Sequence, residues 1–302
     1  MTTSSIVGRW FGGRIRTQPE PGSTLWFFRR DRLAVVSLAT LLIVVLASIL
    51  APFLTPYAEE GLGEPNLPNK FLAPSLAHPL GTDSLGRDQL ARLLFGSRTS
   101  LSMGLMVVSV AVIIGAPLGA LAGYFGGRVD EIIMRLTDVF LAFPPLLLAI
   151  GIAAALGPSF TNAMFAIALT WWPWYTRLVR AQALSLRERS FVEAARGIGV
   201  KDVTIIRQHI LPNVLTPVLV QGTLDIGSAI LIAAGLSFIG LGARPPVADW
   251  GAMINEGRLY VLSGRWWLAT FPGLAIFLTA LAFNLLGDGV RDATDPRTRM
   301  AG

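Results

Sequence analysis

The sequence predicts an all-α membrane protein with six transmembrane helices. The chain of 302 residues is 53% hydrophobic and only 15% charged, whereas soluble domains are closer to one quarter charged. Its apolar residues gather in uncharged runs, and a run of about 20 residues crosses a hydrocarbon core of about 30 Å as a helix. Charged and Pro/Gly-rich segments separate the runs, so the chain should cross the bilayer repeatedly.

The composition excludes several kinds of chemistry. The chain has no cysteine and only two histidines, which removes disulfides, thiolate metal sites and cysteine nucleophiles. No Gly-x-x-x-x-Gly-Lys-Ser/Thr sequence is present, so the chain lacks a phosphate-binding loop for ATP. The net charge of +6 comes mainly from arginine, which a hydrophobic chain uses to set its topology. We therefore expect neither an enzyme nor a nucleic-acid-binding protein, and no cofactor or metal in this chain.

The amino-terminal part predicts one membrane span followed by an outer segment. Residues 1–32 are polar and rich in arginine, and residues 33–55 form the first transmembrane helix. A cleaved signal peptide is the alternative, but both the leader and the apolar run are too long for one. Residues 56–98 are too long for a simple connection and should fold against the outer surface, with a short amphipathic helix over residues 83–95.

Residues 99–287 predict a core of five further helices. An uncharged run ends at residue 127, and a third helix should begin near Asp130, where an acid favours a helix start. On that helix Arg135 and Asp138 are three residues apart and are predicted to pair.

The next uncharged run, residues 139–176, is too long for one span. Residues 157–159 read Gly-Pro-Ser and should break it into two helices. At its end Trp171, Trp172 and Trp174 are predicted to be membrane-interface anchors. A fifth span from about Asn213, a sixth over residues 266–287 and a tail over residues 288–302 complete the chain.

Six spans place both termini on one side, and the basic residues indicate which side. The segments grouped with the termini carry most of the arginines, and cytoplasmic loops carry such an excess. We therefore predict cytoplasmic termini in a plasma membrane. The predicted inner set is Arg9, Arg14, Arg16, Arg29, Arg30, Arg32, Arg128, Arg135, Arg177, Arg180, Arg187, Arg189, Arg196, Lys201, Arg207, Arg291, Arg297 and Arg299.

The inner loop, residues 181–212, is predicted to be a helix-turn-helix. Ala194 and Ala195 would give its first helix a nearly bare face, and Gly199 would supply the turn, since glycine tolerates a positive φ. Asp202 should cap a second helix over residues 203–210, and Pro212 should end it before the fifth span. An ordinary basic loop is the alternative, but the turn residues and the link to a span favour a surface held by a partner.

At these residues the chain resembles the permeases of ATP-binding-cassette (ABC) importers. Glu193-Ala194-Ala195, Gly199 and Ile210-Leu211-Pro212 resemble the EAA loop of that family. His209 departs from the general pattern, which has an apolar residue there, but His-Ile-Leu-Pro is usual in the dipeptide, oligopeptide and nickel branch. The chain looks like the C-type permease of that branch, similar to DppC or OppC. The remaining segments that match the branch are residues 78–83, 86–88, 96–101, 130–144, 236–242, 245–246, 250–251, 284–292 and 295–297.

The resemblance implies a type I importer fold and a set of partners. A second permease similar to DppB or OppB would pair with this chain, and an extracytoplasmic binding protein would deliver the substrate. Two cytoplasmic ATPases would hold the ATP and Mg²⁺. Glu193 to Gly199 would enter a cleft of one ATPase, and residues 203–212 would pass its movement to the fifth span. The implied cargo is a dipeptide or oligopeptide, with nickel or another small solute as the alternative.

Two further sites remain as hypotheses. Asp225 is an acid deep inside the fifth span, and intramembrane acids usually face a cavity or a partner, so it either lines the translocation path or pairs with a neighbour. His78 and Asp83 could be considered for metal, but they are too few ligands, and a role in a turn is favoured. A self-contained secondary transporter is the alternative class, although the internal repeats expected of one are not visible.

Overall fold

The computed structural model describes residues 28–294, and these are helical apart from their connections and one isolated β-bridge between Thr82 and Asp88. Most of the predicted amino-terminal segment, the end of the tail and the 295–297 match lie outside these residues. The helices are α2 (Arg32–Ile49), α3 (Ala51–Leu54), α4 (Ala58–Leu62), η2 (Leu67–Asn69), α5 (Gln89–Phe125), α6 (Gly127–Leu141), α7 (Pro145–Leu156), α8 (Phe160–Arg187), α9 (Ser190–Gly197), α10 (Asp202–Ile205), η3 (Ile206–Ile210), α11 (Leu211–Phe238), α12 (Trp250–Arg258), η4 (Val261–Ser263) and α13 (Trp267–Thr294).

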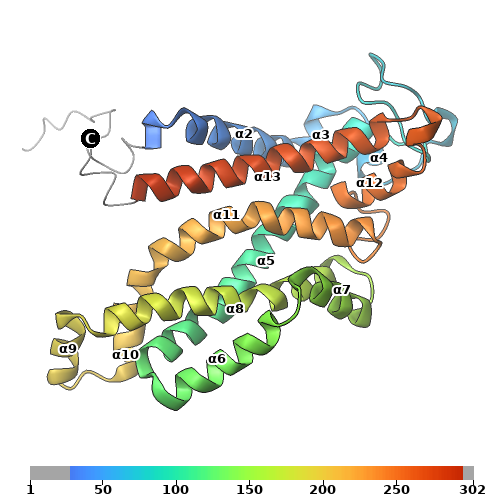
Figure 1. The fold of residues 1–302 in the computed structure, drawn as a ribbon. Coiled ribbons are helices and arrows are strands. Elements are labelled where there is room, and N and C mark those ends of the chain that lie inside the picture. Colours follow the sequence, from blue (N-terminus) through green and yellow to red (C-terminus); the bar gives the residue numbers. More distant parts are fainter. Residues whose placement is uncertain (1–27, 295–302) are drawn as a thin grey trace, which may run out of the picture.

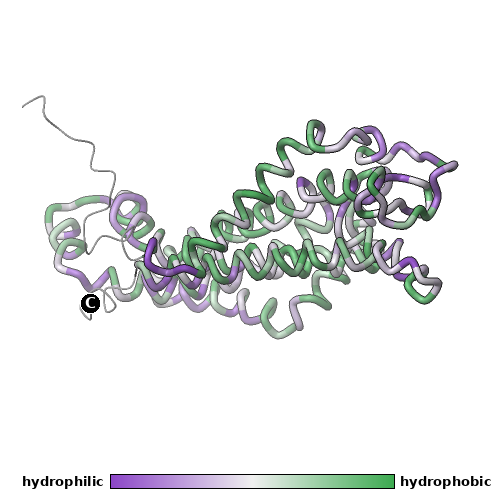
Figure 2. Tube along the Cα trace, turned by 90° about the horizontal axis from the view of Figure 1, so that it is seen from above, coloured by the Kyte–Doolittle hydropathy of each residue, from purple (hydrophilic) through white to green (hydrophobic). Residues whose placement is uncertain are grey.

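The long helices form one elongated bundle with polar ends. Helices α2 and α13 lie side by side, α11 follows, and α8 and α6 lie beyond it, with α5 crossing the bundle (Figure 1). Helices α9 and α10 are at one end, while α3, α4 and α12 are at the other (Figure 1). Figure 2 shows apolar residues along the middle and hydrophilic residues gathering toward both ends. The start of α2, the end of α13 and the 181–212 loop thus share one end of the bundle.

In residues 28–294, four helices are long and apolar enough to cross a membrane, or five if α6 and α7 count as one bent span. The remaining predicted crossing, the fourth along the chain, corresponds to α8, which has 28 residues. Its tryptophans, Pro173 and arginines make α8 less apolar than the other long helices. The prediction of a helical membrane protein is therefore confirmed, while the number six remains a prediction.

The break at residues 157–159 is present, between α7 and α8, but a second break was not predicted. Helices α6 and α7 are separated by residues 142–144 and bent by 85°. Pro144 and Pro145 explain the bend, because consecutive prolines force the preceding residues out of helical geometry.

Helices α5 and α8 pack closely along their length. Three glycines on one face of α5, Gly115, Gly119 and Gly123, lie four residues apart and face the backbone of α8. A Cβ atom at each would come within 2.6 Å of an α8 carbonyl oxygen, from Trp172, Thr176 and Arg180 respectively. Small residues at this spacing let two helix backbones approach closely, so the row sets the α5–α8 distance.

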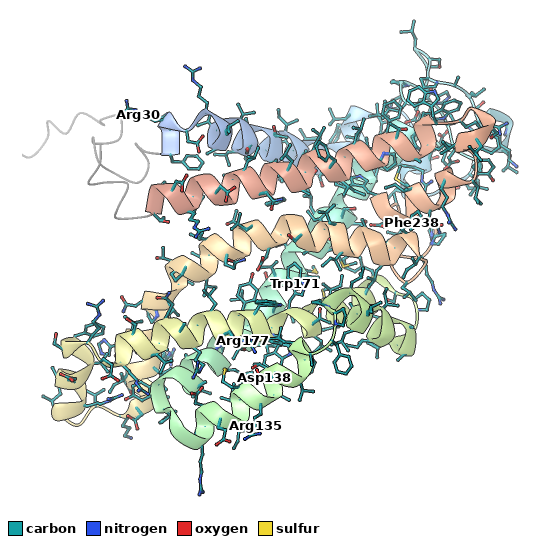
Figure 3. The ribbon with its side chains drawn as sticks, viewed as in Figure 1. Arg30, Arg135, Asp138, Trp171, Arg177 and Phe238 are labelled. Atoms are coloured by element: carbon teal, nitrogen blue, oxygen red, sulfur yellow. The ribbon has the colours of Figure 1, made fainter. Side chains whose placement is uncertain are left out.

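The predicted pair of Arg135 with Asp138 is wrong. Arg135 instead bonds Glu131 one turn earlier, at 2.6 Å. Asp138 accepts from Arg177 on α8, also at 2.6 Å, and the two side chains meet between α6 and α8 in Figure 3. Arg180 forms a second, two-pronged pair with Asp130. The arginines of α8 therefore attach α6 to the bundle, an arrangement that depends on the tertiary structure.

The outer segment folds against the ends of α5, α12 and α13, as expected, but the helix predicted over residues 83–95 is wrong. Helix α5 begins at Gln89, where the Asp88 carboxylate accepts from the Ala91 amide at 2.7 Å, and it continues without a break to Phe125. Asp83 accepts from both Arg87 and Arg92 at 2.7 Å. The same two arginines bond Glu256 of α12, so four charges join the outer segment to the bundle.

Candidate functional site

The first part of the site is the turn between α9 and α10. Gly199 has a φ of +79°, as predicted. The Gly199 amide donates to the Arg196 carbonyl at 2.9 Å, and the Val200 amide donates to the Ala195 carbonyl at 3.0 Å. These two bonds form a Schellman cap, in which a left-handed residue ends the helix. The turn is therefore a defined structure.

The two alanines of α9 do not form one bare face. Val192 and Ala195 are buried in the main apolar core together with Ile205 and Ile210, so this side of the loop is fastened to the bundle. Ala194 is exposed beside Glu193. The alternation follows from helix geometry, because consecutive residues point about 100° apart.

The exposed side of the loop is unusually apolar around its turn. Ile198 is 81% exposed and Val203 is 74% exposed. Glu193 and Ala194 are exposed on the same short unit. Exposed apolar side chains with charged neighbours are typical of protein interaction surfaces. The loop thus combines an anchored face with a free one.

Beyond the turn, the chain continues into the membrane as one helix. Residues Asp202–Phe238 form a continuous helix of 37 residues, so the prediction that Pro212 ends a helix is wrong. A π-helical turn, η3, precedes Pro212, and the Leu211 amide donates to the Ile206 carbonyl. A π turn widens the helix, which gives room to a proline ring that would otherwise clash with a carbonyl one turn earlier. Asp202 is the first residue of α10, while Lys201 occupies the cap position.

Tyr124, at the end of α5, holds both arms of the loop. Its hydroxyl donates to Asp202 at 2.6 Å and accepts from Arg196 at 3.1 Å. The Arg196 guanidinium carbon also lies 4.6 Å from the centre of the Tyr124 ring, within the range of a cation–π contact. The sequence reasoning missed this residue, which is 72 or more positions from its partners.

The second part of the site is a cavity of about 710 Å³ between α7, α8 and α11. Asp225 lines it from near the middle of α11. Its Oδ2 accepts from the Tyr175 hydroxyl at 2.6 Å, and its Oδ1 accepts from the Gln221 amide at 2.9 Å. Asp225 forms no ion pair with a basic residue of the described chain. It therefore faces a cavity and has polar neighbours, while its place in the translocation path stays a prediction.

The predicted anchor role is wrong for Trp171 and Trp172, which are buried, and stays a prediction for Trp174, which is 56% exposed. Trp172 is buried, its ring 5.3 Å from that of Phe140. Trp171, labelled on α8 in Figure 3, and Trp174 line the cavity. A second cavity of about 490 Å³ shares Leu178 and Gln221 with the first and extends to Thr294 at the end of α13. Together the two cavities extend from Asp225 toward the end of the bundle that carries α9.

His78 has a structural role, in agreement with the turn interpretation. Its Nδ1 lies 2.9 Å from the Asp88 carboxylate rather than near Asp83, and its ring stacks on Tyr57 with centres 4.6 Å apart. No group of three or more histidine, aspartate or glutamate residues in the described part of the chain could hold a metal ion.

Family models match most of the chain. Residues 115–300 match the model described as "Binding-protein-dependent transport system inner membrane component". Residues 22–74 match the "N-terminal TM domain of oligopeptide transport permease C". The first match includes both parts of the site, and the second includes the first span and part of the outer segment.

Individual relatives agree with these models. The chain is 48% identical to a probable D,D-dipeptide transport system permease protein, DdpC, of Escherichia coli, over 90% of each chain. It is 45% identical to the dipeptide transport system permease protein DppC of Alkalihalophilus pseudofirmus, over 90% of this chain and 88% of that one. It is also 45% identical to the glutathione transport system permease protein GsiD of Pectobacterium atrosepticum, over 90% of this chain and 89% of that one.

The fold also matches a solved structure. The inward-facing MetNI methionine ABC transporter aligns with a TM-score of 0.55 and 18% identity, over 67% of this chain and 96% of that one. At this identity the likeness concerns the fold alone, and it agrees with the predicted importer fold.

Proposed function

The chain belongs to the family of binding-protein-dependent transport system inner membrane components, and from this premise we propose that it moves peptides through the membrane and is driven through its α9–α10 loop. It is a membrane permease subunit rather than an enzyme, and ATP is used by separate subunits of such systems. The observation that carries the proposal is the uninterrupted helix from Asp202 to Phe238.

The loop is suited to transmit force. Its exposed face, with Glu193, Ala194 and Ile198, offers a short helix and a turn to the cleft of an ATPase. Tyr124 holds both arms of the loop, so a push on α9 reaches Asp202 with little slack. Because Asp202 begins the same helix that carries Asp225, displacement at the loop tilts the helix that lines the cavity. This is a physical path between two sites, as coupling requires.

The proposed orientation places this loop and both termini in the cytoplasm. The end of the bundle with α9 and α10 carries most of the basic residues, in accord with the positive-inside pattern. The opposite end, with α4 and α12, faces the extracytoplasmic binding protein. A second, homologous permease completes the path, and two ATPases bind beneath the pair.

The proposed cargo is a dipeptide or a similarly short peptide. The relatives described above are named as transport proteins for D,D-dipeptides, dipeptides and glutathione, and all three named cargoes are short peptides. The cavity volume of about 710 Å³ is within the range of about 300–1,000 Å³ common for small-molecule sites.

Single cysteines test the loop and its side of the membrane, and the chain offers a clean background because it contains none. Ala194→Cys places a thiol on the exposed face of α9, and Leu76→Cys places one at a fully exposed position of the outer segment. In intact cells an impermeant maleimide should label Leu76→Cys and not Ala194→Cys. With a bifunctional reagent, Ala194→Cys should cross-link to a copurifying ATPase, and Leu76→Cys should not.

Labelling of Ala194→Cys from outside would refute the orientation. Cross-linking of neither or both cysteines to the ATPase would refute the role of α9. Purification of the wild-type chain as an active transporter without ATPases and a second permease would refute the proposed assembly.

A further inference from the structure

Near the middle of α11, the carboxylate of Asp225 pairs with no basic residue among residues 28–294. In the other three helices that qualify as spans by themselves, acidic residues are absent or lie near the end, as Asp288 and Asp292 do in α13. Tyr175 and Gln221 each give Asp225 one hydrogen bond. A carboxylate accepts about four such bonds, so both oxygens keep capacity for another donor. An ionised group within a membrane usually pairs with another charge.

The basic residue on the wall of the same cavity is already engaged. Arg177 lines the cavity, but its guanidinium bonds Asp138 of α6 at 2.6 Å. The remaining wall is mainly apolar and aromatic, with Pro145, Leu178 and Ile232 beside the aromatic rings. Trp171 and Trp174 contribute indole rings, and Ser228 contributes a hydroxyl. Indole faces attract cations that approach within about 6 Å. The carboxylate of Asp225 and the indole rings therefore both favour a cationic ligand.

We propose that this cavity binds the protonated amino terminus of the peptide, with Asp225 as the anion that receives the ammonium group. The proposal rests on the function proposed above and deepens it, since it assigns a substrate group to a site. A peptide α-amino group is largely protonated at neutral pH, and it can donate to both carboxylate oxygens, each of which keeps capacity for another donor. Tyr175 and Gln221 orient the carboxylate, and Trp171 and Trp174 surround the cation.

The position of the cavity agrees with transient binding during passage. It adjoins the second cavity, which extends toward the cytoplasmic end of the bundle in the proposed orientation. Asp225 shares its helix with the α10 arm of the loop, so movement of α11 changes the distance between Asp225 and the rings of α8. Release of the peptide is thereby linked to the movement of α11 that the ATPases produce.

The test compares two peptides that differ only at the amino terminus. The purified permease–ATPase complex in lipid nanodiscs, without binding protein, is mixed with millimolar Ala-Ala or N-acetyl-Ala-Ala. Saturation-transfer NMR detects weak binding of each peptide. We expect Ala-Ala to bind the wild type about tenfold more strongly than the acetylated peptide, the effect of one charge-assisted hydrogen bond of about 1.4 kcal/mol.

Asp225→Asn should abolish this preference and leave the weak acetylated signal unchanged. Asp225→Glu should retain part of the preference. Asp288→Asn is the matched control, because it makes the same chemical change at an exposed position near the end of α13, and it should behave as the wild type does.

Equal binding of the two peptides by the wild type would overturn the proposal and requires no variant. An unchanged preference in Asp225→Asn would overturn it as well. If Asp225→Asn separates the two permeases and Asp288→Asn does not, the carboxylate pairs with a basic side chain of the second permease, and the proposal is wrong. Binding-protein-driven uptake of Ala-Ala by the wild type is measured beside these tests, and its absence refutes the proposed function itself.

Discussion

Replacing Gly119 with alanine tests whether the glycine row sets the distance between α5 and α8. The added Cβ would lie 2.4 Å from the Thr176 carbonyl oxygen, 2.9 Å from the Val179 Cβ and 3.0 Å from the Arg180 amide nitrogen. Two of these three atoms are backbone and cannot rotate away. The helices must therefore separate, and contacts along the whole α5–α8 seam loosen.

The expected cost follows from two opposed effects. Forcing an extra carbon into a packed site costs about 1–3 kcal/mol, and the rigid neighbours place this site at the upper end of that range. Alanine regains about 1 kcal/mol over glycine in a helix interior. We expect Gly119→Ala to lose about 2 kcal/mol of unfolding free energy.

Gly151→Ala is the matched control, since its Cβ would meet nothing within 4 Å on helix α7. It should be neutral or slightly stabilising. The two variants are compared by the SDS mole fraction at half-unfolding in mixed micelles, followed by circular dichroism. Equal midpoints, or a more stable Gly119→Ala, would refute the inference that the α8 backbone is in contact with this face of α5.

Two further substitutions test the loop and the outer segment. Gly199→Val should reduce ATPase association or uncouple ATP hydrolysis from uptake, because a β-branched residue is strained at a φ of +79°. Gly240→Val is the control, since it imposes equal strain at a φ of +86° at the opposite end of the bundle, and it should keep the ATPases bound. Equal loss of ATPase binding in both variants would contradict the role of the loop. Glu256→Gln removes one carboxylate from the buried Arg87 and Arg92 and should lower the unfolding free energy by about 2–3 kcal/mol. Glu131→Gln breaks the exposed pair with Arg135 and should cost at most about 1 kcal/mol, so similar SDS midpoints for the two would contradict the buried network.

Local patterns account for the predictions that succeeded. The turn at Gly199 was predictable because only a few residue types tolerate a positive φ. The break at residues 157–159 was predictable because Gly-Pro-Ser does not favour a continued helix. The membrane class followed from composition and from the length of the uncharged runs. Two local signals were present but not used, namely the spacing of Gly115, Gly119 and Gly123 and the Pro144-Pro145 pair.

The predictions that failed, and the contact that was missed, depended on how the helices pack. Arg135 and Asp138 are close enough on α6 to pair, yet Asp138 bonds Arg177, because the packing of α6 against α8 brings a second arginine to it. Pro212 was expected to end a helix, but a π turn accommodates it, and neighbouring packing decides which outcome is realised. Tyr124 had no recognisable signal, since nothing in its local sequence indicates a bond to Asp202.

The sequence by itself determined the membrane class, the order of the long helices, the loop and its turn, and the lone acid of α11, because hydrophobicity, charge and backbone preference are properties of single residues and short segments. Only the tertiary structure decided that α10 and α11 form one continuous helix, that Tyr124 holds both arms of the loop, and that Asp225 faces a cavity with Tyr175 and two indole rings. Such relations depend on which helix faces pack together, and that choice is made by the free energy of the whole bundle.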